Sequence, residues 1–67
     1  MHIKYIYINE KDKTYTISNY QRYNEFDLNV IKEFEGLRRD IIVKVNELNK
    51  DKYEFVAYDI FLKENKI

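Results

Sequence analysis

The sequence predicts a small α+β domain in ββαββ order, with a four-stranded sheet in the order 2-1-4-3 and one helix on one face. Three observations carry this prediction. Runs of β-branched and aromatic residues lie near both ends of the chain. Apolar residues at helical spacing occupy the middle. The charged stretch NEKDK at 9–13 is largely repeated as NKDK at 49–52, which indicates two similar turns.

Residues 2–8 and 14–18 are expected to form the first β-hairpin. The run HIKYIYI is β-branched and aromatic, and in TYTIS the apolar Tyr15 and Ile17 alternate with hydroxyl side chains. The stretch between the two runs contains asparagine and aspartate, which suit a short turn.

The segment NEFDLNVIKEFEG, residues 24–36, is expected to be the helix. Asn24 is a suitable N-cap, and acidic side chains follow it in the first turn, where the helix dipole favours anions. Apolar residues recur at three- and four-residue spacing. Gly36, the only glycine, stands where a residue in the left-handed region would end the helix.

Two interpretations of residues 37–50 are open. In one, the helix continues to about residue 49, because the apolar residues keep stepping by three or four; the order is then ββαβ with one long helix at 24–49. In the other, the helix ends at Gly36 and DIIVKVNE is a strand. A mid-helix glycine costs about 1 kcal/mol relative to alanine, and β-branched residues suit strands. The repeated NKDK turn favours this second hairpin, which we adopt.

The distribution of apolar residues over the strand faces predicts the strand order. Residues 2–8 and 53–62 are apolar on both faces and belong at the centre, whereas 14–18 and 41–46 alternate and belong nearer the edges. The order 2-1-4-3 follows, with the first and last strands parallel and the helix as a right-handed crossover between them. This order of elements resembles the β-grasp arrangement of ubiquitin and of the immunoglobulin-binding domains of streptococcal protein G. No sequence motif carries the resemblance, so it implies no function.

The composition bounds the class of function. We expect one domain spanning 1–67, near the lower size limit for folding without a stabilising cross-link such as a disulfide. With no cysteine, one histidine and one glycine, the chain lacks the usual parts of a zinc site, a phosphate-cradling loop or a nucleophilic active site. We therefore expect no enzyme, no cofactor and no metal. No apolar run approaches the ~20 residues of a membrane span, and the start lacks a signal-peptide pattern, which predicts a cytoplasmic protein without membrane contact.

Charge is segregated along the chain although the total is zero. Residues 24–36 carry a net charge of −3, and residues 1–23 carry a net charge of +2. An acidic helix predicts a protein partner with a basic surface, such as a groove that normally holds nucleic acid, because opposite charges steer the encounter. The acidic residues predicted to bind the partner are Glu25, Asp27, Glu33 and Glu35.

The second candidate surface is the sheet face that a single helix would leave open. Tyrosine clusters mark protein interfaces, since each ring combines a large apolar body with a polar tip. The same rings could stack nucleic-acid bases, but a neutral chain lacks the basic field that such binding needs, so nucleic acid is not the expected partner. This face could also close a homo-oligomer. The predicted members are Tyr5, Tyr7, Tyr15, Tyr53 and Tyr58.

The sequence thus predicts a small non-enzymatic protein-binding module that acts through an acidic helix and an exposed tyrosine-rich sheet face. Heavy use of lysine, asparagine, isoleucine and tyrosine is typical of AT-rich genomes, including those of phages and mobile elements. One form of the hypothesis is therefore a phage- or mobile-element-encoded inhibitor of a host nucleic-acid-handling or defence protein. The alternatives are a single-stranded nucleic-acid-binding protein using the sheet tyrosines, and a structural homodimer.

Overall fold

A computed structural model describes residues 3–22 and 25–65. It shows a small α+β domain with a four-stranded mixed sheet in the order β3-β1-β2-β4. β1 is antiparallel to both β2 and β3, and β4 is parallel to β2. The α+β class is confirmed, and the predicted strand order 2-1-4-3 is wrong. The elements are β1 (Lys4–Asn9), β2 (Thr14–Ser18), β3 (Ile31–Gly36), α1 (Arg38–Lys50), β4 (Glu54–Phe55) and α2 (Tyr58–Asn65).

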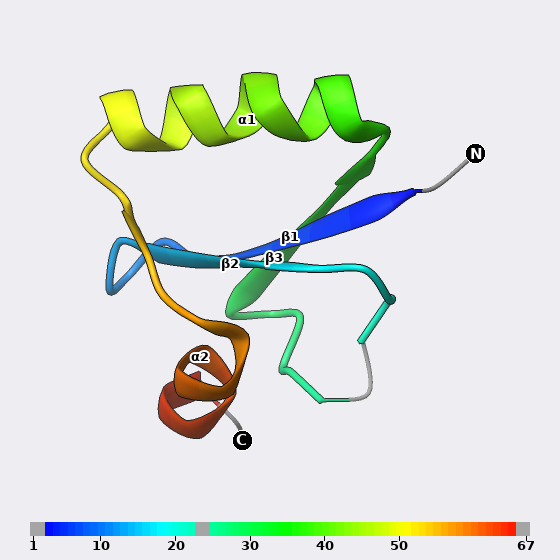
Figure 1. The fold of residues 1–67 in the computed structure, drawn as a ribbon. Coiled ribbons are helices and arrows are strands. Elements are labelled where there is room, and N and C mark those ends of the chain that lie inside the picture. Colours follow the sequence, from blue (N-terminus) through cyan, green and yellow to red (C-terminus); the bar gives the residue numbers. More distant parts are fainter. Residues whose placement is uncertain (1–2, 23–24, 66–67) are drawn as a thin grey trace.

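The sheet lies between two layers, with α1 on one face and α2 on the other (Figure 1). Ile6 and Ile8 of β1 pack into the core beneath α1, whereas Tyr7 packs into the core toward α2. This explains why the first strand is apolar on both faces, and its predicted central place in the sheet is confirmed. The predicted open sheet face is wrong, because α2 and Phe26 of the loop before β3 pack on it.

The first hairpin is confirmed. β1 and β2 pair from Asn9 opposite Thr14 through to Tyr5 opposite Ser18, and residues 10–13 form the turn. The Asn9 Oδ1 atom accepts the backbone N–H of Asp12 at 2.9 Å, which closes the turn.

Residues 24–36 were predicted as a helix, and this prediction is wrong. A loop leads into β3, and Asn24 lies outside the described residues. The run IKEFEG alternates, and pairing with β1 places Phe34 on the α1 face of the sheet and Glu33 on the other. Gly36 does not have a positive φ; a Cβ there would lie 2.7 Å from the Cβ of Asp40. This glycine therefore permits the close turn from β3 into α1.

Residues 38–50 form α1, so the strand predicted at 41–46 is wrong. The alternative of one long helix at 24–49 is correct only for this second half. Ile41, Val45 and Leu48 recur at helical spacing and pack on the sheet. Their burial outweighs the weak helix propensity of the β-branched residues, because packing of an amphipathic face supplies most helical stability.

The NKDK stretch ends α1 and is not the turn of a second hairpin. The N–H of Lys52 donates to the carbonyl of Asn49 at 3.1 Å, and the N–H of Tyr53 donates to that of Leu48 at 2.9 Å. With Lys52 at φ 69°, these two bonds form a Schellman motif. Tyr53 and Leu48 also pack in the same core, as that motif favours.

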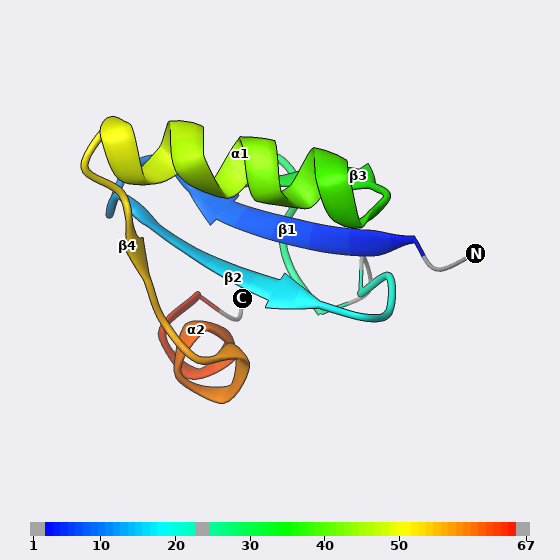
Figure 2. The same ribbon diagram turned by 45° about the horizontal axis from the view of Figure 1, so that its top comes forward.

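Residues 53–62 do not form the long central strand predicted for them. β4 has two residues at an edge of the sheet, and α2 follows from Tyr58. The segment is apolar on several sides because it changes from strand to helix; Phe61 is fully buried with its ring centre 5.4 Å from that of Phe26. α1, not a crossover between parallel central strands, joins the two edge strands (Figure 2). Within the described ranges, neither helix has the length and apolarity to cross a membrane.

Candidate functional site

The five tyrosines predicted for one binding face lie on both sides of the sheet. Tyr15 and Tyr53 pack beneath α1, whereas Tyr5, Tyr7 and Tyr58 pack toward α2. Tyr7 and Tyr15 are 0% and 2% exposed, and the other three are half-buried. These residues therefore form no common exposed patch. Tyr20, which the sequence did not single out, is 70% exposed.

The four predicted acidic residues lie on a loop and a strand, so the prediction of an acidic helix is wrong. Glu25 and Asp27 precede β3, and Glu33 and Glu35 belong to it. Asp27 shapes the loop: its Oδ1 atom accepts the N–H of Asn29 at 3.0 Å. This carboxylate acts as a turn former.

Arg22 is the centre of a polar network that the sequence analysis missed as a unit. Its guanidinium donates to Ser18 Oγ and to Glu25 Oε2, both at 3.1 Å, and lies 4.2 Å from the centre of the Tyr58 ring. Tyr58 in turn donates its hydroxyl to Glu25 Oε1 at 2.6 Å. The hydrogen bond that Arg22 donates to Glu25 raises the pKa of Arg22, and burial together with Glu25 raises the pKa of Tyr58 to about 12. The network ties the loop to α2.

The Tyr7 hydroxyl extends these contacts beneath the sheet. It donates to Glu33 Oε2 at 2.8 Å and accepts the backbone N–H of Arg22. Gln21 Nε2 donates to the other oxygen of Glu33 at 3.2 Å. Burial raises the pKa of Tyr7 far above its ordinary value, so the hydroxyl stays protonated and remains a donor to the carboxylate. These bonds hold the loop against the sheet.

The direction of each backbone group in the sheet follows from its hydrogen bonds. The carbonyls of Lys13 and Tyr15 accept the N–H groups of Glu54 at 2.9 Å and Val56 at 3.0 Å, so the odd-numbered residues of β2 face β4. The even-numbered residues of β2 therefore face β1. By the observed register, the backbone N–H and C=O groups of odd-numbered β1 residues point toward β2, and those of even-numbered β1 residues point toward β3.

β3 consequently presents free backbone groups along its outer edge. The register directs the N–H and C=O of Lys32 and Phe34 toward β1, and those of Glu33 and Glu35 away from it. The N–H of Ile31 follows the same alternation, since it donates to a loop carbonyl at 2.8 Å and not to β1. Because β3 is the last strand on its side of the sheet, Glu33 and Glu35 offer two N–H and two C=O groups at this edge.

The two sides of this edge differ in chemistry. Glu33 and Glu35 lie on the α2 face, where Glu35 is exposed and Glu33 is half-buried. On the α1 face, a groove of about 200 Å³ separates β3 from the helix. Its lining residues are Phe34, Asp40, Val43, Lys44 and Glu47.

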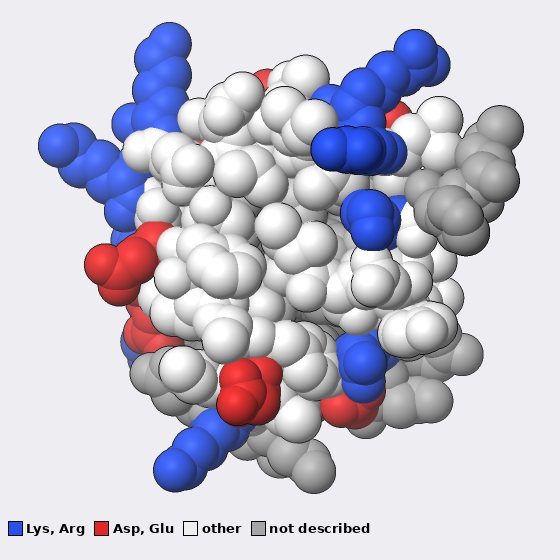
Figure 3. Space-filling model, in the orientation of Figure 1, with Lys and Arg blue, Asp and Glu red and all other residues white. Residues whose placement is uncertain are grey.

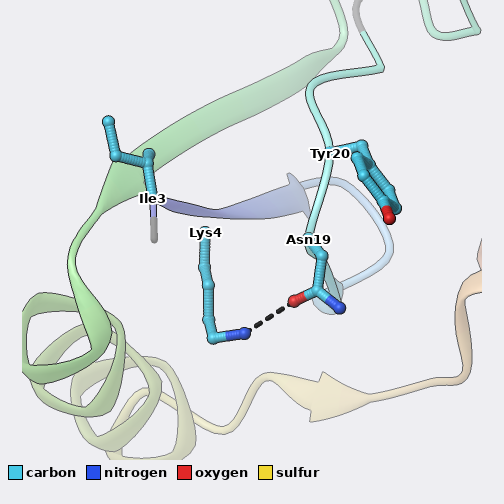
Figure 4. A pocket seen from close by; sticks show the side chains of 4 residues that line it. All are labelled: Ile3, Lys4, Asn19 and Tyr20. Carbon is cyan, nitrogen blue, oxygen red and sulfur yellow. Dashed lines mark hydrogen bonds between the residues drawn. The ribbon is translucent and has the colours of Figure 1, made fainter. Parts of the chain in front are cut away.

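A second hollow of about 350 Å³ lies where β1 begins and β2 has ended (Figure 4). Lys4 Nζ donates to Asn19 Oδ1 at 2.6 Å, and the side chains of Ile3 and Tyr20 extend to opposite sides of this bond (Figure 4). The hollow's one cation, Lys4, is thus bonded to its one side-chain amide, Asn19, and its lining residues include no acid–base pair. Nowhere in residues 3–22 and 25–65 do three His, Cys, Asp or Glu side chains gather as metal ligands.

Charged side chains on the face shown in Figure 3 surround a largely uncharged centre. This view is from the β4 side, as in Figure 1, and β3 lies at the opposite edge of the sheet. The acidic edge of β3 is therefore separate from this face. The one sequence signal that could have revealed it is the period-two alternation of IKEFEG.

Neither a protein-family model, nor a curated protein, nor a solved structure matches the chain. The candidate site is therefore defined by the geometry of the described residues alone: the outer edge of β3, its two carboxylates and the adjoining groove.

Proposed function

We propose that the protein is a small non-enzymatic binding module for a protein partner with a basic surface. One observation carries the proposal: Glu33 and Glu35 lie on the same face of an edge strand. Residues two apart in a strand are only about 7 Å apart. Their two carboxylates thus create a local negative field at the rim of the sheet, which attracts and orients a basic partner.

Binding is favoured over catalysis by the state of the other ionisable groups. Arg22, Glu25 and Tyr58 are bonded to one another, and Lys4 is bonded to Asn19. These groups support the loops, whereas Glu35 at the outer edge of β3 is exposed. Nucleic-acid-handling proteins are one class of partner with a suitable basic groove.

A charge reversal tests the proposal. Glu35→Lys should weaken binding of a capped lysine homopeptide and reduce its dependence on salt, because one of the attracting carboxylates is replaced by a cation. Glu54→Lys, the same change at the exposed opposite edge of the sheet, is the matched control. Affinity measured by isothermal titration at several salt concentrations gives the comparison. Equal effects of both variants would show that only total charge matters and would refute the assigned surface.

A further inference from the structure

We infer that the outer edge of β3 binds an extended basic segment of the partner as an added strand, which extends the four-stranded sheet to a fifth. This inference rests on the proposed function and specifies how the partner is held. The N–H and C=O groups of Glu33 and Glu35 point off the edge, at the spacing that a neighbouring strand requires. Backbone pairing would supply the affinity, and the side chains on the two faces would supply the selectivity.

On the α2 face, the added strand meets the two carboxylates. Residues directly opposite one another in neighbouring strands point to the same face, with Cβ atoms about 5 Å apart. Lysine or arginine opposite Glu35 therefore reaches an exposed carboxylate. Glu33 already accepts bonds from Tyr7 and Gln21, but each carboxylate oxygen has a further lone pair for an incoming cation.

On the α1 face, the residue between these two basic positions lies opposite Phe34. Its side chain points toward the groove between β3 and α1, where Phe34 and Val43 supply apolar surface beside charged side chains, and where Lys44 Nζ lies 5.4 Å from the centre of the Phe34 ring. A volume of about 200 Å³ accommodates an aliphatic side chain such as valine or leucine. The segment recognised thus has the pattern basic–apolar–basic in extended conformation.

A second copy of this chain is a poor occupant of the same edge. Two copies of β3 could pair antiparallel about a two-fold axis centred on any residue from 32 to 35. A centre at Lys32, Glu33 or Glu35 puts that residue opposite its own copy, and a centre at Phe34 puts Glu33 opposite Glu35. Every such register opposes like charges, which is destabilising, whereas a basic strand has the complementary charge.

Amide hydrogen exchange tests the pairing directly. The probe is a capped peptide of about eight residues, a typical strand length, in which lysine and valine alternate. In the free protein, the N–H groups of Lys32 and Phe34 should exchange slowly because they bond to β1, and those of Glu33 and Glu35 should exchange fast. Adding the peptide should slow exchange at Glu33 and Glu35 specifically. Unchanged exchange at these two amides in the bound state would overturn the inference.

Two control peptides separate this inference from the proposed function. A block peptide has the same composition with the lysines grouped together, and a backbone N-methylated peptide keeps the alternation but lacks donors. The N-methylated peptide should bind about tenfold more weakly than the alternating peptide, because it loses backbone hydrogen bonds. The block peptide keeps its backbone donors but should also bind more weakly, because its lysines no longer lie opposite both Glu33 and Glu35. Equal binding of all three would overturn strand addition while leaving a basic partner in place. No binding of any of them at low salt would overturn the proposed function as well.

Variants of Glu35 separate charge from backbone in the protein itself. Glu35→Gln keeps the outward N–H and should lower affinity for the alternating peptide about two- to fivefold. Glu35→Pro also removes the N–H and should lower affinity by about tenfold, at an edge position that tolerates proline. Glu54→Gln at the opposite edge should have no effect. Equal affinities of folded Glu35→Pro and Glu35→Gln would contradict backbone pairing; if Glu35→Pro fails to fold, the N-methylated peptide gives the same contrast.

Discussion

Replacing Tyr7 with phenylalanine removes a hydroxyl that joins the sheet to the loop before β3. The ring is 0% exposed and keeps its shape, so the substitution leaves the apolar packing intact. What is lost is the bond to Glu33 Oε2 at 2.8 Å and the acceptor for the N–H of Arg22. The experiment therefore isolates two polar contacts of the network.

The expected cost follows from these contacts. A neutral hydrogen bond contributes about 1 kcal/mol and a bond to a charged group about 1.5–3 kcal/mol. Glu33 keeps its bond to Gln21 and some contact with water, which places its loss at the lower end. The sum is about 2.5 kcal/mol, to be compared with a total stability of about 3–10 kcal/mol for a chain of this length. At about 4–8 °C per kcal/mol, the melting temperature should fall by about 10–20 °C.

Thermal unfolding followed by circular dichroism at neutral pH measures this shift. Tyr20→Phe is the matched control, because its ring is 70% exposed; its effect should stay within about 0.5 kcal/mol. Urea denaturation should show an unchanged slope for both variants, as the buried area is the same. If the melting temperature of Tyr7→Phe equals that of the Tyr20→Phe control, the network does not have the stabilising role assigned to it.

Three further predictions concern single sites. Lys52 has a left-handed backbone with φ 69°, so Lys52→Gly should stabilise the protein by about 1 kcal/mol in urea unfolding. Lys50→Gly, inside the helix, should destabilise it by a similar amount. A Lys52→Gly protein less stable than Lys50→Gly would contradict the helix cap. Thr16 Oγ1 is buried without a hydrogen-bond partner among the described residues, so Thr16→Val should raise stability by about 1 kcal/mol, and a loss of stability would reveal a bond to this oxygen. The pKa of Tyr58 is raised to about 12 in the fold and is about 10 in the unfolded chain. Its contribution is therefore complete below about pH 10 and is lost as pH rises through about 12, a decline that should be shallower in Tyr58→Phe when unfolding and tyrosinate absorbance are followed together.

Local patterns predicted the parts of the fold that depend on local interactions. The hairpin follows from two alternating runs around an asparagine-containing turn, and it is present as β1 and β2. The NKDK stretch was predicted to be a second hairpin turn, and this is wrong, because it ends α1. The spacing of Ile41, Val45 and Leu48 fits a helix, and their packing on the sheet outweighs the weak helix propensity of the β-branched residues beside them.

The error at residues 24–36 has a different origin. Phe26 and Phe34 fit a helical spacing, yet they also fit a loop followed by a strand, and nothing local separates these alternatives. Pairing with β1 decides between the two alternatives, because β3 forms its hydrogen bonds along the edge of β1 that β2 does not occupy. Such pairing joins residues far apart in the chain, which single-sequence propensities do not describe.

The sequence by itself determined the α+β class and the first hairpin, and its charge pattern included Glu33 and Glu35 among four acidic candidates. The tertiary structure decided that Glu33 and Glu35 lie on a strand. On a helix, side chains two residues apart point in different directions, whereas on a strand they share a face. Pairing on one side of β3 also decided which backbone groups remain free on the other. The same two carboxylates thereby became one surface, because the register of β3 on β1 fixes both their common direction and the free edge beside them.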